Sequence, residues 1–294
     1  MPARMTVAIA SVDRSRILHE TVAGLLEQSV RADEILLCIA SPEDCLPETA
    51  QLPTVRVIVG PRGLTLQRNR VLDAIDEAGG IVVFLDDDVE LDPRYLENAL
   101  RFMESNPNVA AFSGFAIADG FEAGEIARER AKRLIAEYSP APNREVREMT
   151  GLYGCNMAMR ASIAQAVRFD ERLRLYALFE DVDFGERMKK HGRVVSFPDC
   201  RLVHLAVRSG RISARRMGYA QIANPVYLLR KGSVNRTYLL ILLRNVVLAN
   251  LAGLLIAHRG KSRLQRMGQL AGNVRAILDL IRFGAQPERI AGVS

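Results

Sequence analysis

The stretch that decides the fold is GGIVVFLDDDVELDP, residues 79–93. Five apolar residues, 81–85, lead directly into three aspartates, Asp86, Asp87 and Asp88. An apolar run without alternation is typical of a strand that is covered on both faces. Three neighbouring carboxylates repel one another, because each makes the ionisation of the next more costly. A divalent cation such as Mg²⁺ or Mn²⁺ removes that cost, since it prefers hard oxygen ligands.

Short apolar runs alternate with helical patterns on both sides of this stretch. Three strand-like runs precede it, MTVAIAS, DEILLCIAS and VRVIVG, and helical patterns precede the second strand and follow the third. Further candidates follow it: helix LDPRYLENALRFMESNP, strand GCNMAMR, helix EDVDFGERMKKHGR, strand RVVSFP and, less regular, RLVHLA. The alternation predicts an α/β fold with a mostly parallel sheet sandwiched by helices. Ligands bind beyond the carboxyl ends of strands in such sheets, where the aspartates stand.

Composition sets broad limits on the protein class. A chain of 294 residues with 49% apolar content is ample for a buried core, as one large domain or two modest ones. Four widely spaced cysteines without a Cys-x-x-Cys pair argue against a zinc knuckle or a disulfide framework, and fit a reducing compartment. The start, MPARMTVAIAS, is interpreted as the first strand rather than a signal peptide.

Charge is distributed unevenly along the chain. Residues 201–294 hold 16 Lys and Arg against two acids, a net charge of +14, whereas residues 1–200 hold 24 against 32, a net charge of −8. A basic C-terminal third on an acidic body indicates that the two parts meet different partners. The plainer alternative is a solvated helical surface. Nucleic acid is not expected as a partner, because the sequence has no known nucleic-acid-binding motif and no basic segment with aromatic residues between the basic ones.

The C-terminal region contains a long apolar span, residues 238–257, that is long enough to cross a bilayer. Arg244, Asn245 and Asn250 interrupt it. An arginine near the membrane centre costs about 2.5–3.5 kcal/mol, while each Leu or Ile returns about 0.3–0.6 kcal/mol, so the balance is near neutral. We interpret the span as a helix packed partly on protein and partly at an anionic membrane interface. A soluble helical bundle, or a homo-oligomer interface, is the alternative.

A second acidic cluster lies in LYALFEDVDFGERMKK, where Glu180 and Asp181 stand at the start of a helical pattern. A carboxylate there can accept a proton as a general base when a hydroxyl group attacks. The helix N-terminus favours the ionised form, whereas burial raises the pKa, and the pattern leaves the balance open. Helix capping is the plain alternative, and it is the role we expect for Asp183.

The two acidic clusters together give the chain a recognisable pattern. FLDDD is followed about ninety residues later by FEDVDFGERMKKHG, and in this the chain resembles the family 2 glycosyltransferases of GT-A fold. The resemblance covers roughly residues 5–205 and extends to VAIAS, LLEQS, QRNRVLDAI, GCNMAMR and FPDCRLVH. It implies a Rossmann-like GT-A domain, a nucleotide-diphospho-sugar transferase, over residues 1–205. Beyond the resemblance, charge and hydropathy lead us to expect a basic helical region over residues 206–294, associated with a membrane.

The resemblance implies a metal site and a catalytic base. Asp88 would be the main ligand of Mn²⁺ or Mg²⁺, Asp86 would bind the metal and face the donor, and His204 would complete the site. Asp181 would be the base, with Glu180 beside it.

Donor contacts are implied at further positions. Arg68 in QRNR would approach the nucleotide or its phosphates, and Asn156 in GCN would line the sugar pocket. The full set of implied donor-binding residues is Ser11, Asp44, Arg68, Asp86, Asp87 and Asn156. One departure matters, because many relatives carry an aspartate pair where CIASPED has Ile39 and Ala40. Asp44 is the candidate substitute for the residue that contacts the nucleotide base, and the identity of that nucleotide base is left open.

The implied reaction is an inverting, metal-assisted transfer of a sugar from a nucleotide-diphospho-sugar to a hydroxyl of a glycan or lipid-linked acceptor. The expected setting is polysaccharide or cell-envelope glycan biosynthesis, on the cytoplasmic inner face of the membrane. A haloacid-dehalogenase-like phosphatase is the first alternative, but Val89 and Glu90 do not fit the residues that usually follow its aspartates. The second is a non-catalytic membrane or polysaccharide scaffold, against which the two intact acidic clusters argue.

Overall fold

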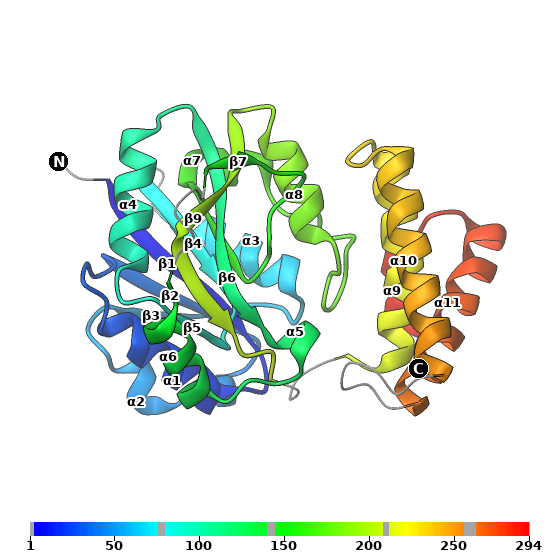
Figure 1. The fold of residues 1–294 in the computed structure, drawn as a ribbon, viewed down its shortest axis with the longest axis horizontal. Coiled ribbons are helices and arrows are strands. Elements are labelled where there is room, and N and C mark those ends of the chain that lie inside the picture. The colour runs from blue at the N-terminus through cyan, green and yellow to red at the C-terminus, as the bar shows by residue number, and fades with distance from the viewer. Residues whose placement is uncertain (1–2, 76–79, 140–144, 208–211, 256–262, 294) are drawn as a thin grey trace. The chain divides into compact units, whose positions relative to one another are not determined.

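A computed structural model describes residues 3–75, 80–139, 145–207, 212–255 and 263–293 (Figure 1). The chain forms two compact units, which we call the sheet unit and the helical unit. The sheet unit comprises Met1–Arg62, Leu66–Phe169 and Phe184–Gly210, and the helical unit comprises Gly63–Thr65, Asp170–Asp183 and Arg211–Ser294. The expected domain boundary at residue 205 stays a prediction.

The sheet unit is built on one mixed sheet in which most strands are parallel. Its strand order is β3-β2-β1-β4-β8-β6-β9-β5, with β7 paired to β9. Strands β3, β2, β1 and β4 run parallel, as do β6 and β9, whereas β8, β5 and β7 run antiparallel to their neighbours. The predicted α/β fold with a mostly parallel sheet is confirmed. The strands are β1 Arg4–Ser11, β2 Glu34–Ile39, β3 Val55–Val59, β4 Gly80–Leu85, β5 Val89–Leu91, β6 Val109–Asp119, β7 Arg147–Glu148, β8 Asn156–Arg160 and β9 Arg193–His204.

Helices cover both faces of this sheet, which explains the unalternating apolar run of β4 (Figure 1). Val83 and Leu85 belong to one core cluster, which takes in residues of α1 and α4. Val82 and Phe84 belong to a second cluster, which takes in residues of α3, α7 and α8. Successive side chains of β4 therefore enter opposite cores. The helices are α1 Ser15–Leu26, α2 Pro47–Ala50, α3 Leu64–Ala74, α4 Tyr95–Ser105, α5 Gly120–Ala123, α6 Arg128–Glu137, α7 Ala161–Val167 and α8 Glu180–Met188.

Strands β6 and β9 differ from what the sequence pattern indicates. The pattern does not single out β6, and it divides β9 into two short runs, whereas β9 is continuous through Pro198. The β6–β9 pairing has three register shifts, one of them between Ser113 and Phe115. Gly114 lies at that irregularity, where an added Cβ would stand 2.3 Å from the carbonyl oxygen of Cys200. Pro and Gly within strands mark such irregular pairing, which a period-two pattern misses.

The helical unit contains α9 Ala214–Lys231, α10 Arg236–Leu255 and α11 Arg263–Phe283. One of its clusters joins Leu173, Ala177 and Val182 to Tyr227 and Leu228 of α9, so the segment before α8 packs on α9. Helix α10 takes up most of the expected apolar span, whose last two residues, 256–257, lie outside the described residues. Within the described parts of the chain, no helix has both the length and the apolar character needed to cross a membrane.

Candidate functional site

Asp87 fastens the loop that follows β4 to the end of β1. The hydroxyl of Ser11 donates to Asp87 Oδ2 at 2.6 Å, and Arg14 Nη1 lies 2.8 Å from Asp87 Oδ1. Thr21 of α1 donates its hydroxyl to the Asp87 carbonyl at 2.6 Å. Burial raises the pKa of the Asp87 carboxyl, although Arg14 acts in the opposite direction. Asp87 and Ser11 therefore hold the loop in place, and their contact with a donor stays a prediction.

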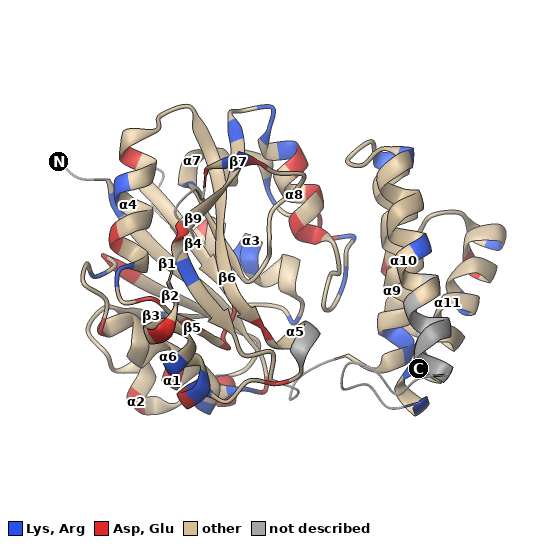
Figure 2. Cartoon of the chain, in the orientation of Figure 1, with Lys and Arg blue, Asp and Glu red and all other residues tan. Residues whose placement is uncertain are grey.

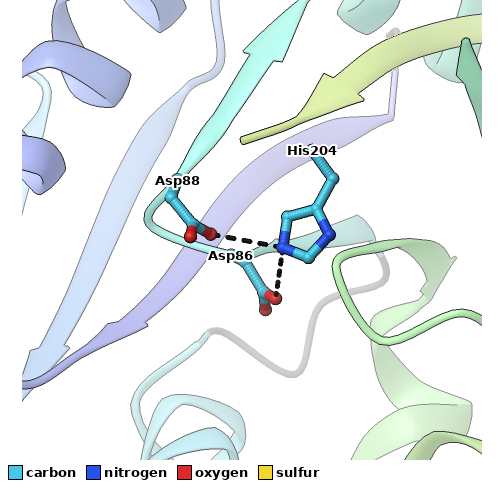
Figure 3. Close-up of side chains that lie close together, drawn as sticks. All are labelled: Asp86, Asp88 and His204. Carbon is cyan, nitrogen blue, oxygen red and sulfur yellow. Dashed lines mark ion pairs between the residues drawn. The ribbon is translucent and has the colours of Figure 1, made fainter. Parts of the chain in front are cut away.

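Asp86 and Asp88, just after the carboxyl end of β4, lie together with His204, the last residue of β9 (Figure 3). His204 Nε2 is 3.4 Å from Asp88 Oδ1 and 3.8 Å from Asp86 Oδ2. One ligand atom from each of the three side chains lies within 4.8 Å of the others. The antiparallel pairing of β5 with β9 places Val89 opposite His204, which brings the histidine to the aspartate loop. The three predicted metal ligands thus meet in space.

Asp119 orients His204 from the side opposite the aspartate loop. His204 Nδ1 lies 2.9 Å from Asp119 Oδ1, at the register position where β6 pairs with β9. The hydroxyl of Tyr153 also bonds the Asp119 carboxylate. A carboxylate on one ring nitrogen holds the other toward a metal site, as with metal-ligating histidines generally. Burial by itself lowers the pKa of His204, but Asp119, Asp88 and Asp86 outweigh it and raise the pKa to about 10.

Arg14 is a second contributor that the sequence pattern did not single out. Its Nη1 lies 3.3 Å from Asp88 Oδ2, in addition to its pairing with Asp87, and its Nη2 donates to the Val207 carbonyl at 2.8 Å. The backbone N–H of Val207 donates to Asp88 Oδ2 at 2.8 Å. One oxygen of Asp88 is thus held by Arg14 and Val207, while the other faces His204.

Arg68 of α3 supports Asp86 from within the core. Its side chain is 2% exposed, and its Nη2 donates to the Gly154 carbonyl at 2.7 Å and lies 3.4 Å from Asp86 Oδ1. The guanidinium carbon lies 5.8 Å from the ring centroid of Phe84 and 5.4 Å from that of Phe169. Asp86 keeps 31% of its side chain exposed, so it is the aspartate of the metal group most open to a ligand. A contact of Arg68 with phosphates stays a prediction.

Two of the predicted donor contacts have structural partners of their own. Asn156 is fully buried, and its Oδ1 accepts from the hydroxyl of Tyr95, while its Nδ2 has no hydrogen-bond partner among the described residues. Asp44 accepts three backbone N–H groups, from Asp13 at 2.6 Å, Ala40 at 3.1 Å and Ser41 at 3.0 Å. It therefore ties the loop after β1 to the loop after β2. The donor contacts of Asn156 and Asp44 stay predictions.

Glu180 and Asp181 begin α8, whose first four residues belong to the helical unit, and they follow a strained segment. Leu175, Ala177 and Phe179 have φ of 62°, 53° and 70°. A left-handed conformation costs a residue other than glycine about 1–2 kcal/mol, so surrounding contacts must hold this segment. Asn224 of α9 provides one, because its Nδ2 donates to the Leu178 carbonyl at 2.8 Å.

The side chain of Asp183 contacts the end of α9. It is fully buried, lies 2.8 Å from Lys231 Nζ and accepts a hydrogen bond from the Ser233 hydroxyl. Lys231 also lies 2.6 Å from Asp170, which accepts from the hydroxyl of Tyr227 at 2.7 Å. The end of α9 thus holds the first turn of α8, which carries the proposed base. The sequence prediction treated Asp183 as a helix cap alone and counted Lys231 among the basic residues that could meet anionic headgroups, not as its partner.

The two acidic clusters belong to different units. Asp86, Asp88 and His204 lie in the sheet unit, and Glu180 and Asp181 lie in the helical unit. The convergence of the two clusters on one donor therefore stays a prediction.

A family model described as Glycosyl transferase family 2 matches residues 6–168, more than half of the chain. The chain belongs to glycosyl transferase family 2. In this family 2 member, the matched span contains the aspartate loop, Arg14, Arg68, Asp119 and Asn156. It ends before α8 and β9, so His204 is supported by geometry and sequence pattern, and Asp181 by sequence pattern alone. None of the curated proteins compared with the chain matches it.

Solved structures similar to this family 2 member are glycosyltransferases by their descriptions. The mannosyltransferase PcManGT from Pyrobaculum calidifontis, in complex with GDP-Man and Mn²⁺, is 15% identical with a TM-score of 0.57, over 95% of this chain and 88% of its own. S. aureus TarS 1-349 in complex with UDP-GlcNAc is 16% identical with a TM-score of 0.56, over 98% and 83%. GalNAc-T7 with UDP, GalNAc and Mn²⁺ is 12% identical with a TM-score of 0.56, over 96% and 59%. At these identities the similarity establishes the shared GT-A fold.

Proposed function

We propose that this protein transfers a sugar from a nucleotide-diphospho-sugar to a hydroxyl of a glycan or lipid-linked acceptor, with inversion at the anomeric carbon. The observation that carries the proposal is the group formed by Asp86, Asp88 and His204 at the carboxyl ends of β4 and β9, with Asp119 behind the histidine. This is the edge at which ligands bind in α/β sheets. The similar structures with GDP-Man, UDP-GlcNAc or UDP support a nucleotide-sugar donor and leave its base open.

The residues present suit Mn²⁺, with Mg²⁺ as the alternative. Two carboxylates supply the hard oxygen ligands that both ions prefer, and the imidazole adds a nitrogen ligand. The pairing of His204 with Asp119 is the outer contact that metal-ligating histidines need. When bound, the cation neutralises the diphosphate as it leaves. Two of the similar structures are described with Mn²⁺.

The chain's own residues then position the donor and accept a proton. Asp181 acts as the general base for the acceptor hydroxyl, and Glu180 lies beside it. An inverting transfer needs one base and no covalent nucleophile, because the hydroxyl attacks the anomeric carbon directly from the face opposite the diphosphate. The proposed donor-binding residues are Ser11, Asp44, Arg68, Asp86, Asp87 and Asn156.

The proposed setting is polysaccharide or cell-envelope glycan biosynthesis, with the protein in the cytoplasm and peripheral on the inner face of the membrane. The basic character of residues 201–294, with a net charge of +14, supports an anionic membrane as the partner of this region. A lipid-linked or membrane-bound glycan acceptor would be found at such a surface.

A panel of nucleotide sugars tests the proposal. A thermal-shift screen with Mn²⁺ should show a raised melting temperature with one donor, because a ligand that binds only the native state stabilises it. Release of nucleoside diphosphate from that donor then distinguishes a transferase from a phosphatase, which would instead release phosphate from a monoester. A protein that binds no nucleotide sugar with Mn²⁺ would favour the scaffold alternative.

A further inference from the structure

Helix α11 exposes its large apolar residues. Leu264 is 78% exposed, Met267 59%, Val274 57%, Leu278 58% and Ile281 80%. The side that α11 buries is small or polar, and a helix of a water-soluble protein normally shows the reverse. The residues on that buried side are Arg266, Gln269, Gly272, Asn273, Ala276 and Asp279.

The buried side of α11 is already occupied by α9 at very close range. An added Cβ at Gly272 would stand 2.0 Å from the carbonyl oxygen of Arg215, and one at Gly218 would stand 1.9 Å from that of Gln269. Asn273 Nδ2 donates to the Gly218 carbonyl at 2.7 Å. Small residues that bring two helix backbones together, with large apolar residues facing outward, are typical of helices that pack in a lipid environment.

The exposed apolar residues form one stripe. The residues 264, 267, 274, 278 and 281 are separated by 3, 7, 4 and 3 positions, which places them on one face of a helix. We call this set the α11 stripe. Arg263, Arg275 and Arg282 are exposed on the same helix. Apolar stripes with basic neighbours are the pattern of helices that lie in the plane of a membrane interface.

Charge favours an anionic surface over a second copy of the chain. Residues 211–294 contain 14 Lys and Arg but two acids, Asp279 and Glu288. Both acids are already paired inside the helical unit, Asp279 with Arg275 and Arg289, and Glu288 with Arg172. Figure 2 shows Lys and Arg distributed over α9, α10 and α11, with few acidic residues among them. A second copy would bring charge of the same sign, whereas anionic headgroups complement it.

We propose that the α11 stripe inserts into the boundary between headgroups and acyl chains of an anionic bilayer. The helix lies in the membrane plane, with Arg263 and Arg282 contacting the lipid phosphates. This inference rests on the membrane association proposed above and identifies the α11 stripe as the element that contacts lipid. Its test does not depend on sugar transfer.

Vesicle co-sedimentation of the full chain tests this assignment. The wild-type protein should bind phosphatidylcholine vesicles that contain about one third phosphatidylglycerol, bind pure phosphatidylcholine weakly, and lose binding as salt rises. Leu278→Glu with Ile281→Glu should lower binding more than about tenfold, because two apolar contacts become two repelled charges. Val59→Glu, at an apolar residue of β3 that is 55% exposed, is the matched control and should leave binding unchanged.

The arginines provide a second, independent test. Arg263→Ser and Arg282→Ser should each weaken binding about fivefold at low salt and reduce its salt dependence. The thermal unfolding of every variant should match the wild type, since the changed side chains are exposed. Wild-type-level binding by the Leu278→Glu, Ile281→Glu protein would overturn the proposal. A second result would also overturn it: the wild-type protein does not bind anionic vesicles and sediments as a dimer, whereas the double variant sediments as a monomer.

Discussion

His204 and Asp119 face each other at one register position of β6 and β9, with His204 Nδ1 2.9 Å from Asp119 Oδ1. The contact fixes Nε2 as the ring nitrogen that points at Asp86 and Asp88. It also ties the proposed metal site to a pairing between two strands, rather than to a loop alone.

Replacing Asp119 should therefore weaken metal binding without unfolding the protein. Asp119→Asn keeps the hydrogen bond that Asp119 Oδ1 accepts from the Phe121 N–H at 2.8 Å, since Asn caps helices about as well as Asp. The same oxygen still faces His204 Nδ1, but the negative charge behind the ring is lost, so we expect Mn²⁺ affinity to fall about 10- to 100-fold, as is usual when the outer partner of a metal-ligating histidine is changed. Calorimetric titration measures this. Asp199→Asn, at an exposed acid, is the control, and equal affinity in both variants would contradict the role of Asp119.

Arg14 should act as an internal cation for the aspartate loop. Arg14→Met leaves Asp87 and Asp88 without their guanidinium partner, and because Arg14 is only 14% exposed we expect a loss of about 2 kcal/mol. Mn²⁺ should restore a larger part of the melting temperature in this variant than in wild type, because the ion replaces the missing charge. Arg62→Met, which breaks an exposed pair with Asp13, should cost almost nothing. Equal Mn²⁺ shifts in wild type and Arg14→Met would be inconsistent with this account.

Lys231 should stabilise the turn that carries Asp181. Lys231→Met leaves the carboxylate of the fully buried Asp183 without its cation. Breaking a buried ion pair in this way lowers the free energy of unfolding by about 3 kcal/mol in comparable cases. The double variant with Asp183→Asn should be more stable than the two single losses predict, because residue 183 then no longer carries a buried charge without its lysine partner. Urea unfolding of the single and double variants measures the difference. Strictly additive losses would show that the two residues do not interact.

The pKa of Asp170 predicts how the stability of the helical unit changes with pH. Burial by itself raises the pKa of Asp170, but hydrogen bonds from Lys231 and Tyr227 lower it more, so the folded-state pKa lies below its usual value. A depressed folded pKa adds stability above the unfolded pKa of about 4, and this stability is lost as pH falls through the folded value. Asp170→Asn should therefore flatten the fall in unfolding free energy at acidic pH. An acid limb as steep as that of wild type would refute this contribution.

The sequence predicted the parts of the site that lie next to regular patterns. The strand before Asp86 and Asp88 was readable because an apolar run buried on both faces has a distinct signature. His204 was predictable from its position after the last strand run. Arg14, Asp119 and Lys231 were not, because their roles depend on long-range pairings that periodicity does not encode. β6 was missed because Gly114 and its register shifts break the alternation that marks a strand.

The base assignment has its own kinetic test. Asp181→Asn should lower kcat more than about a hundredfold, the usual contribution of a positioned general base, while donor binding stays unchanged. Glu171→Gln, another acid of the same segment, serves as the control. A normal kcat in Asp181→Asn would remove the residue from the mechanism and leave the metal site untouched.

The central claim is that Asp86, Asp88 and His204 together hold a cation that sugar transfer requires. The most direct measurement is nucleoside diphosphate release from the matching nucleotide sugar, titrated with Mn²⁺, in wild type, Asp88→Asn and His204→Ala. We expect wild-type activity to vanish with a chelator and return with Mn²⁺, Asp88→Asn to stay inactive at any Mn²⁺ concentration, and His204→Ala to need much more Mn²⁺. Full activity in chelator, or an Asp88→Asn protein that turns over normally, would contradict the account.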